Sequence, residues 1–164
     1  SRRTHRAEVV EIVDAYIDTG EGTRARSLRF GDTLTVAVVV RVQRSCRVSL
    51  ELIVKDSQRQ PVVFSSSGIS EGVEFTLSAG NHLLKATVHN LPLAQGDYYL
   101  DLMIARTGME FLDYLEDALM FTVDRCDPNL TGFGYTQCRG QGSVYLHVDY
   151  ELLKASGSPE CANG

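Results

Sequence analysis

The feature of this sequence that most constrains its fold is a hydrophobic period of two residues. In Thr33–Val42 (TLTVAVVVRV) every second side chain is apolar, and Arg47–Lys55 (RVSLELIVK) repeats the pattern with polar residues between. Such alternation is typical of a β-strand that packs one face on a core and turns the other toward solvent or a ligand. The two stretches therefore predict antiparallel strands.

Further strands are expected along most of the chain. The candidates are Glu8–Ile17, Pro61–Ser65, Val73–Leu77, Leu83–His89, Tyr98–Ala105, Leu119–Val123 and Ser143–Tyr150. Turn-forming pairs such as Gly31-Asp32 and Gly96-Asp97 separate them. About nine short strands with regular turns predict an all-β, antiparallel β-sandwich of the jelly-roll or immunoglobulin-like kind.

One segment departs from the alternation, because Leu112 and Leu115 lie at helical spacing among acidic residues. We therefore expect a short helical turn at residues 109–117. A chain of 164 residues is long enough for one domain with a substantial core. We expect residues 1–7 to be a linker or tail, residues 8–152 to form the sandwich, and residues 153–164 to be a flexible tail.

Charge and motif content argue against several function classes. The net charge is −5 and the pI is about 5.3, which disfavours nucleic acid and anionic membrane surfaces as partners. The sequence contains no phosphate-binding loop, dinucleotide fingerprint, nucleophile elbow or zinc-protease motif. The longest apolar run is shorter than the roughly 20 residues of a membrane helix. We therefore predict no catalytic residue, no metal site and no cofactor in this chain.

The cysteines leave the redox environment open. Cys46, Cys126, Cys138 and Cys161 form no C-x-x-C pair, so they lack an ordinary zinc signature. We interpret them as free thiols in a reducing cytoplasm, with a Cys126–Cys138 bridge as the alternative. Because the chain starts with Ser, we expect it to be a piece of a larger polypeptide.

The strand Tyr98–Ala105 has a second face of mixed chemistry. If the strand turns Tyr98 and the alternate apolar residues after it to the core, the intervening aromatic, acidic and sulfur-containing side chains point outward. A sugar needs polar partners for its hydroxyls and an apolar or aromatic surface for its C–H groups. The late strand and two other strands offer similar groups. The candidate carbohydrate-binding residues are Tyr99, Asp101, Met103, Tyr145, His147, Asp149, Arg41 and Glu51. The alternative is that these are ordinary exposed side chains, with Tyr used for its strand preference.

Five stretches resemble, in order, segments of one known family. They are SLRFGDTLTVAVVV (27–40), LELIVKDSQRQPVV (50–63), NLPLAQGDYYLDL (90–102), LDYLEDALMFTVDR (112–125) and GFGYTQCRGQGSVYLHVDYEL (132–152). Together they resemble the C-terminal carbohydrate-binding module of Wzt-type ATPase subunits of O-antigen polysaccharide ABC transporters. The chain departs from the family in having no Trp, with Tyr150 where the family's tail often ends in Trp, and in its cysteines.

The resemblance implies a non-catalytic β-sandwich fused after a nucleotide-binding domain, at the cytoplasmic face of the bacterial inner membrane. ATP would bind only to that other domain. The implied ligand is the lipid-linked O-polysaccharide, often read through a chemical cap at its non-reducing end, so that chain completion is coupled to export. The implied partners are the transporter permease, through the parent chain, and a second copy in a homodimer, with the late strand 143–150 exchanged in some members. Binding residues vary within the family, so none is transferred.

Two other functions remain open at this point. An extracellular adhesion or structural β-sandwich would bind protein through a sheet edge and would carry disulfides. A hydrolase with scattered carboxylates would degrade the polymer, since paired acids can meet only in the fold.

Overall fold

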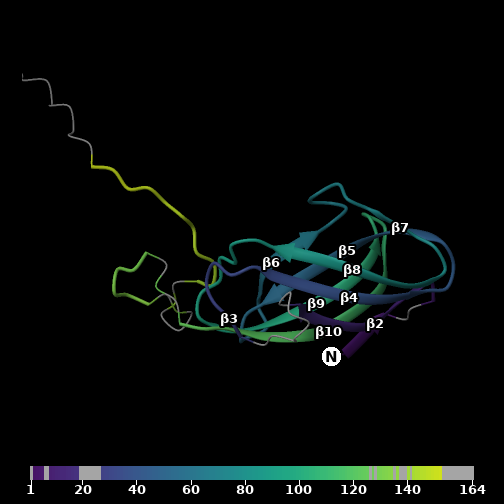
Figure 1. Ribbon diagram of the computed structural model, residues 1–164, viewed down its shortest axis with the longest axis horizontal. Coiled ribbons are helices and arrows are strands. Elements are labelled where there is room, and N and C mark those ends of the chain that lie inside the picture. The colour runs from purple at the N-terminus through teal and green to yellow at the C-terminus, as the bar shows by residue number, and fades with distance from the viewer. Residues whose placement is uncertain are drawn as a thin grey trace, which may run out of the picture.

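Two β-sheets pack face to face in the computed structural model (Figure 1), which describes residues 2–5, 8–18, 27–125, 127, 129–134, 136, 140 and 142–152. The large sheet contains β1 (Arg2–His5), β3 (Ser27–Leu28), β5 (Cys46–Lys55), β6 (Pro61–Ser66), β7 (Phe75–Leu77), β9 (Gly96–Arg106) and β10 (Glu110–Val123). The small sheet contains β2 (Val10–Asp18), β4 (Leu34–Val42) and β8 (Gly80–Val88). The predicted all-β sandwich is confirmed.

The strand order places β9 and β5 in the middle of the large sheet. Its main path runs β1-β10-β9-β5-β6, while β3 pairs with β10 and β7 with β5. The small sheet has the order β2-β4-β8. All pairs are antiparallel except β3 with β10. No helix occurs among the described residues, and therefore none that is long and apolar enough to span a bilayer.

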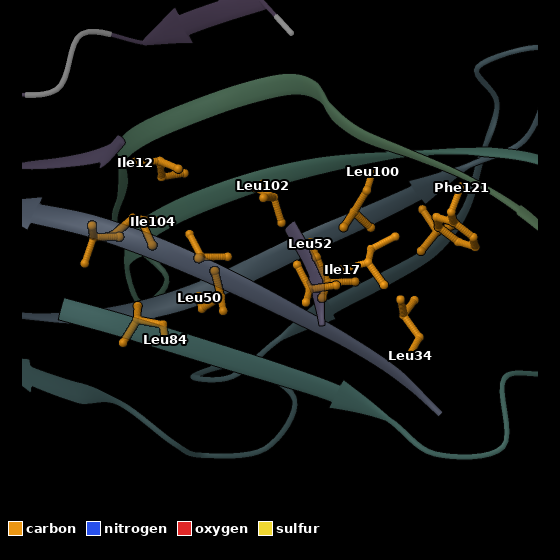
Figure 2. Packing of buried hydrophobic residues seen from close by; sticks show 14 of the residues in the cluster. Ile12, Ile17, Leu34, Leu50, Leu52, Leu84, Leu100, Leu102, Ile104 and Phe121 are labelled. Carbon is orange, nitrogen blue, oxygen red and sulfur yellow. The ribbon is translucent and has the colours of Figure 1, made fainter. Parts of the chain in front are cut away.

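The core lies between the two sheets and is built by the alternation seen in the sequence. From the large sheet Leu50, Leu52, Leu100, Leu102, Ile104 and Phe121 face Ile12, Ile17, Leu34 and Leu84 of the small sheet (Figure 2). Burying each such side chain contributes about 1.5–3 kcal/mol relative to leaving it in water. Tyr98 stacks on Phe121 with ring centroids 5.5 Å apart, and its hydroxyl donates to the carbonyl of Ala94.

The helical turn expected at residues 109–117 is wrong, because Glu110–Val123 forms one long strand. The strand is interrupted by register shifts between Phe111 and Asp113 and between Leu115 and Leu119. Each shift inserts residues that have no partner on β9, which breaks the period of two. The spacing of three between Leu112 and Leu115 therefore comes from a bulge, although it has the form of a helical repeat. In the second bulge Asp117 adopts a φ of 47°.

The first residues of the chain, expected to be linker or tail, include strand β1, which pairs with β10. Arg3 anchors it: its guanidinium donates to the carbonyl of Ile12 at 2.7 Å and lies 3.3 Å from Asp113 Oδ1. Asp113 also accepts the Ile12 amide at 2.7 Å, so one buried carboxylate joins β10 of the large sheet to β2 of the small sheet. Burial raises the pKa of Asp113, and Arg3 with the Ile12 amide offsets part of that rise.

The strand expected at Ser143–Tyr150 is also absent from the described structure. Only Val144 forms a bridge, antiparallel to Leu93, and the chain then runs away from the sandwich (Figure 1). In this segment Leu146, Val148, Tyr150 and Leu152 are exposed. Residues 153–164 and Cys126, Cys138 and Cys161 lie outside the described residues, while Cys46 is not bridged.

Candidate carbohydrate-binding face

The outer face of the large sheet, turned away from the core, brings together four of the predicted residues. On β9 the core takes Tyr98, Leu100 and the alternate residues after them, so Tyr99, Asp101 and Met103 point the other way, as predicted. Glu51 on β5 stands directly opposite Met103. Directly opposed side chains on neighbouring strands lie about 4.5–5.5 Å apart.

Three of these side chains are not open to solvent, contrary to expectation. Asp101 and Glu51 are each 3% exposed and Met103 is 1% exposed. The reason is visible at Asp101, where side chains from both flanking strands close over β9. Lys55 Nζ lies 2.6 Å from Asp101 Oδ1, and the Tyr114 hydroxyl donates to Oδ2 at 3.0 Å. The Asp117 amide in the bulge of β10 donates to Oδ1 at 2.8 Å. Asp101 therefore has a structural role in this state.

A charge cluster, consisting of Lys55, Arg59, Asp101, Tyr114 and Asp117, extends from Asp101. Lys55 Nζ lies 2.8 Å from Asp117 Oδ1, and Arg59 Nε lies 3.0 Å from Asp117 Oδ2. Burial alone would lower the pKa of Lys55, but hydrogen bonds to the two carboxylates raise it. Burial opposes ionisation of Asp117 as well, yet Lys55 and Arg59 hold its pKa below the usual range. Burial and the Asp101 carboxylate raise the pKa of Tyr114 to about 12. Lys55 and Asp117 are thus charged at neutral pH, and each cation of the cluster lies within ion-pair distance of a carboxylate.

Tyr99 lies beside this cluster and its ring is already occupied. The Arg59 guanidinium lies over the Tyr99 ring, 3.1 Å from the centroid. A cation over an aromatic face contributes about 0.5–1 kcal/mol at an exposed site. A sugar could stack on this face of the ring only after Arg59 moved.

The Glu51 hollow lies further along the same face and is open. This cavity of about 290 Å³ is lined by Glu51, Phe64, Ile69, Ala105, Arg106, Gly108, Met109, Glu110 and Phe111. Glu51 Oε1 accepts hydrogen bonds from the hydroxyls of Ser66 at 3.0 Å and Ser49 at 3.3 Å. The hollow therefore combines a buried carboxylate with apolar walls.

Two turns shape the hollow. In the β9–β10 turn the Met109 amide donates to the Arg106 carbonyl, and Gly108 adopts a φ of +68°, which favours glycine. In the turn after β6 the Ser66 hydroxyl accepts the Ile69 amide. A Cβ on Gly68 would run into the side chain of Thr107, so glycine lets the two turns approach closely.

A second, more polar cleft of about 580 Å³ lies at the opposite end of β9. Its walls are formed by Asp56, Ser57, Gln58, Gln95, Gly96, Asp97, Thr136, Gly140, Gly142 and Ser143. The same sheet thus has an apolar hollow near one end of its central strand and a hydrophilic cleft near the other.

Comparison with known proteins decides the family. A family model described as the Wzt C-terminal domain matches residues 2–136. The chain belongs to the Wzt C-terminal domain family. This domain is the non-catalytic, carbohydrate-binding module of O-antigen ABC transporters. The resemblance seen in the sequence is therefore confirmed over most of the chain. The family model extends it to strand β1 and ends at residue 136, within the last of the five stretches.

One solved structure agrees with this fold. The crystal structure of the C-terminal domain of Wzt superposes with a TM-score of 0.74 at 16% identity, covering 93% of this chain and 88% of that one. A β-D-mannosidase from Dictyoglomus thermophilum gives a TM-score of 0.49 at 22% identity over 73% of this chain and 14% of the other. A β-glucuronidase of glycoside hydrolase family 2 gives a TM-score of 0.48 at 13% identity, covering 70% of this chain and 11% of that one. No curated protein matches the chain.

The remaining predicted residues of this Wzt C-terminal domain lie elsewhere. Arg41 projects from the outer side of the small sheet, where it faces Glu11 at 3.5 Å. Tyr145 packs edge-on against Phe30 with ring centroids 5.3 Å apart, and its hydroxyl accepts a hydrogen bond from Asn129. His147 and Asp149 are exposed on the segment that leaves the sandwich (Figure 1). None of the four joins the outer face of the large sheet.

Sequence reasoning missed the walls of the Glu51 hollow, which are Phe64, Ile69, Met109 and Phe111. Phe64 lies in the predicted strand Pro61–Ser65, for which no buried face is assigned from the sequence. Met109 and Phe111 lie in residues 109–117, where a helical turn is predicted. The signal that could have found them is the Thr107-Gly108 pair, because a hairpin turn there extends β10 back to residue 110.

Proposed function

We propose that this domain binds the non-reducing end of a lipid-linked O-polysaccharide and thereby couples chain completion to export by an ABC transporter. Family membership carries the proposal. The Glu51 hollow supports it, because a half-enclosed site with one buried acceptor and apolar walls suits a sugar that is held and not cleaved. The parent chain would supply the ATPase and contact the permease at the cytoplasmic face of the bacterial inner membrane.

Among the predicted site residues, we propose a direct ligand contact for Glu51. Met103 and Asp101 would support the floor beside it, and Tyr99 with Arg59 would form the neighbouring surface that the polymer crosses. Each hydrogen bond to sugar replaces one to water for little net gain, so affinity is expected in the micromolar to millimolar range, about −4 to −8 kcal/mol.

The test is calorimetric titration of the domain with O-polysaccharide purified from the source strain. We expect saturable binding, and an unchanged polymer length after prolonged incubation. Arg41→Ala is the matched control, because Arg41 lies on the outer side of the small sheet. Absence of binding at millimolar repeat-unit concentrations would refute the proposed function, and loss of polymer length would replace it with hydrolysis.

We also propose that the late segment 143–150 pairs with a second copy of the chain, through the residues that follow the Val144 bridge. Leu146, Val148, Tyr150 and Leu152 alternate with polar residues and are exposed. This pattern is typical of a strand that pairs with another chain. In the described part of the chain β8 pairs with β4 alone, so its other edge can accept a strand. Sedimentation should show a dimer that is lost on truncation after Ser143. A monomer at high concentration in the full chain would contradict this proposal and leave glycan binding untouched.

A further inference from the structure

The Glu51 hollow has an unusual charge balance. Glu51 lies in its floor and Glu110 in its rim, while Arg106 is the single cation among the described residues that line it. Arg106 is engaged, since its guanidinium lies 2.6 Å from Glu110 Oε1. The charge cluster that holds Lys55 and Arg59 is satisfied by its own carboxylates. An anion entering the hollow would therefore meet a buried carboxylate with no unpaired cation to offset it.

The Glu51 carboxylate is held on one side. Both hydrogen bonds that it accepts from described residues end on Oε1, from Ser49 and Ser66. Oε2 is therefore the oxygen left for a ligand. A side chain that is 97% buried and fixed by two hydroxyls offers this acceptor without first having to be ordered.

The walls of the hollow are apolar, which favours a ligand with apolar surface. Phe64, Ile69, Met109 and Phe111 all line the hollow and all remain exposed, Met109 to 80%. Four large apolar side chains around one cavity gain most from a ligand that brings C–H or methyl groups to them.

From these observations we propose that the Glu51 hollow is a subsite for an uncharged terminal sugar. A hydroxyl of this sugar donates to Glu51 Oε2, and its apolar edge packs on the four wall residues. The subsite rejects chain ends that carry phosphate or carboxylate. The proposal rests on the proposed function and specifies which class of chain end this domain accepts.

The experiment is an NMR titration of the ¹⁵N-labelled chain with sets of sugars that differ at C6 alone. Each set contains the methyl glycoside of a 6-deoxyhexose, of the parent hexose and of the hexose 6-phosphate, in the manno, gluco and galacto series. In at least one series we expect the amides of Ile69, Met109 and Phe111 to shift with the 6-deoxy sugar. The parent hexose should bind roughly 10-fold more weakly, the usual effect of one apolar group in a pocket. The 6-phosphate should cause no shift there.

Two matched variants test the charge argument. Glu51→Gln keeps the shape of the side chain and removes its charge. It should weaken binding of the neutral sugars several-fold and reduce the difference in affinity between them and the 6-phosphate. Glu110→Gln releases Arg106 and should let the 6-phosphate bind. Glu11→Gln, on the outer side of the small sheet, should change nothing in these titrations. If Glu51→Gln fails to fold, Ile69→Ala removes an exposed wall residue instead and should reduce the preference for the 6-deoxy sugar.

Three results would overturn the inference. They are equal binding of the 6-phosphate by the unmodified chain, shifts confined to another part of the sandwich, and no shift at the hollow with any series. If the source polysaccharide still binds in calorimetry in those cases, the proposed function stands and only the subsite is wrong. If the polysaccharide does not bind either, the proposed function itself fails.

Discussion

Asp101 and Glu51 are two carboxylates on neighbouring strands of one sheet face, and they are equally buried, yet their surroundings are opposite. Asp101 is neutralised by Lys55 and capped by the Tyr114 hydroxyl and a backbone amide. Glu51 has hydroxyl partners on one oxygen and lines a cavity. A buried charge whose hydrogen-bonding capacity is used up supports the fold, whereas one with an oxygen left over is available for recognition. Burial alone does not separate the two roles.

The largest effect is expected from Lys55→Met, which would leave Asp101 buried without its cation. Breaking one partner of a buried ion pair costs about 3–5 kcal/mol. Urea denaturation should show this loss in the free energy of unfolding. The control is Lys85→Met, because Lys85 is half-exposed and pairs with Asp18, an interaction expected to contribute about 0–1 kcal/mol. Equal losses in the two variants would contradict a special role for the charge cluster.

A smaller difference is expected between two isosteric amides. Asp101→Asn weakens the Lys55 interaction and should cost about 3 kcal/mol. Glu51→Gln retains an acceptor for the Ser66 hydroxyl, so its cost should be near that of one neutral hydrogen bond, about 1 kcal/mol. Urea denaturation of both variants gives the comparison directly. If Glu51→Gln lowered the free energy of unfolding as much as Asp101→Asn, the two carboxylates would contribute equally to stability, contrary to this comparison.

The charge cluster also predicts how stability depends on pH. The pKa of Asp117 lies below its ordinary 3.8, so its contribution is present above that pH and is lost as the pH falls through the folded-state pKa. The pKa of Lys55 lies above its ordinary 10.5, so its contribution is present below that pH and is lost as the pH rises through the folded-state pKa. The free energy of unfolding should therefore fall at both extremes. Tyr114, whose pKa is raised to about 12, adds to the alkaline fall, so Lys55→Met should make that fall shallower without abolishing it.

Asp113 acts in the opposite direction in acid. Its pKa is raised, so its contribution to stability decreases as the pH rises from 3.8 through the folded-state pKa. The contribution of Asp117 is therefore measured as the difference between the free energies of unfolding of the unmodified chain and of Asp117→Asn, followed as the pH is lowered. Asp113 is present in both proteins, so its effect cancels. An unchanged acid limb in that variant would contradict the assignment.

The smallest effect is expected from Tyr99→Ala. Loss of the Arg59 contact should cost about 0.5–1 kcal/mol, and glycan affinity should fall modestly because Tyr99 lies on the same face as the hollow but outside it. Thermal melting and the calorimetric titration check the two parts. Unfolding of this variant would mean that Tyr99 belongs to the core, which the register of β9 contradicts.

Much of the fold could be predicted from the sequence because alternation is a local signal. Leu34 to Val42 and Val48 to Val54 show which side of each strand is buried, and that assignment is confirmed. The bulges of β10 could not be predicted, because a register shift depends on the partner strand as much as on Leu112 or Asp117 themselves. For the late segment, Val144 to Tyr150 has strand periodicity, but periodicity does not specify a partner within the same chain.

The candidate site was harder to predict, because a side chain that points away from the core can still be buried by side chains of neighbouring strands. The alternation placed Asp101 and Met103 on the correct face, but the closing of Lys55 and Tyr114 over β9 depends on side chains from two other strands. The hollow depends on two turns that are distant in sequence and meet where Gly68 approaches Thr107. Contacts of this kind have no periodic signature in the sequence.

The Ile12–Asp113 hydrogen bond has a mechanical consequence for the hollow. Asp113 lies on β10 two residues beyond Phe111, so the clasp between the sheets stands close to the cavity wall. A hydrogen bond at that position opposes sliding of one sheet over the other, so we expect the cavity to have the same width with and without a sugar. For a preformed site of this kind, the association rate is set mainly by diffusional encounter. Differences in affinity among chain ends should then come chiefly from their dissociation rates.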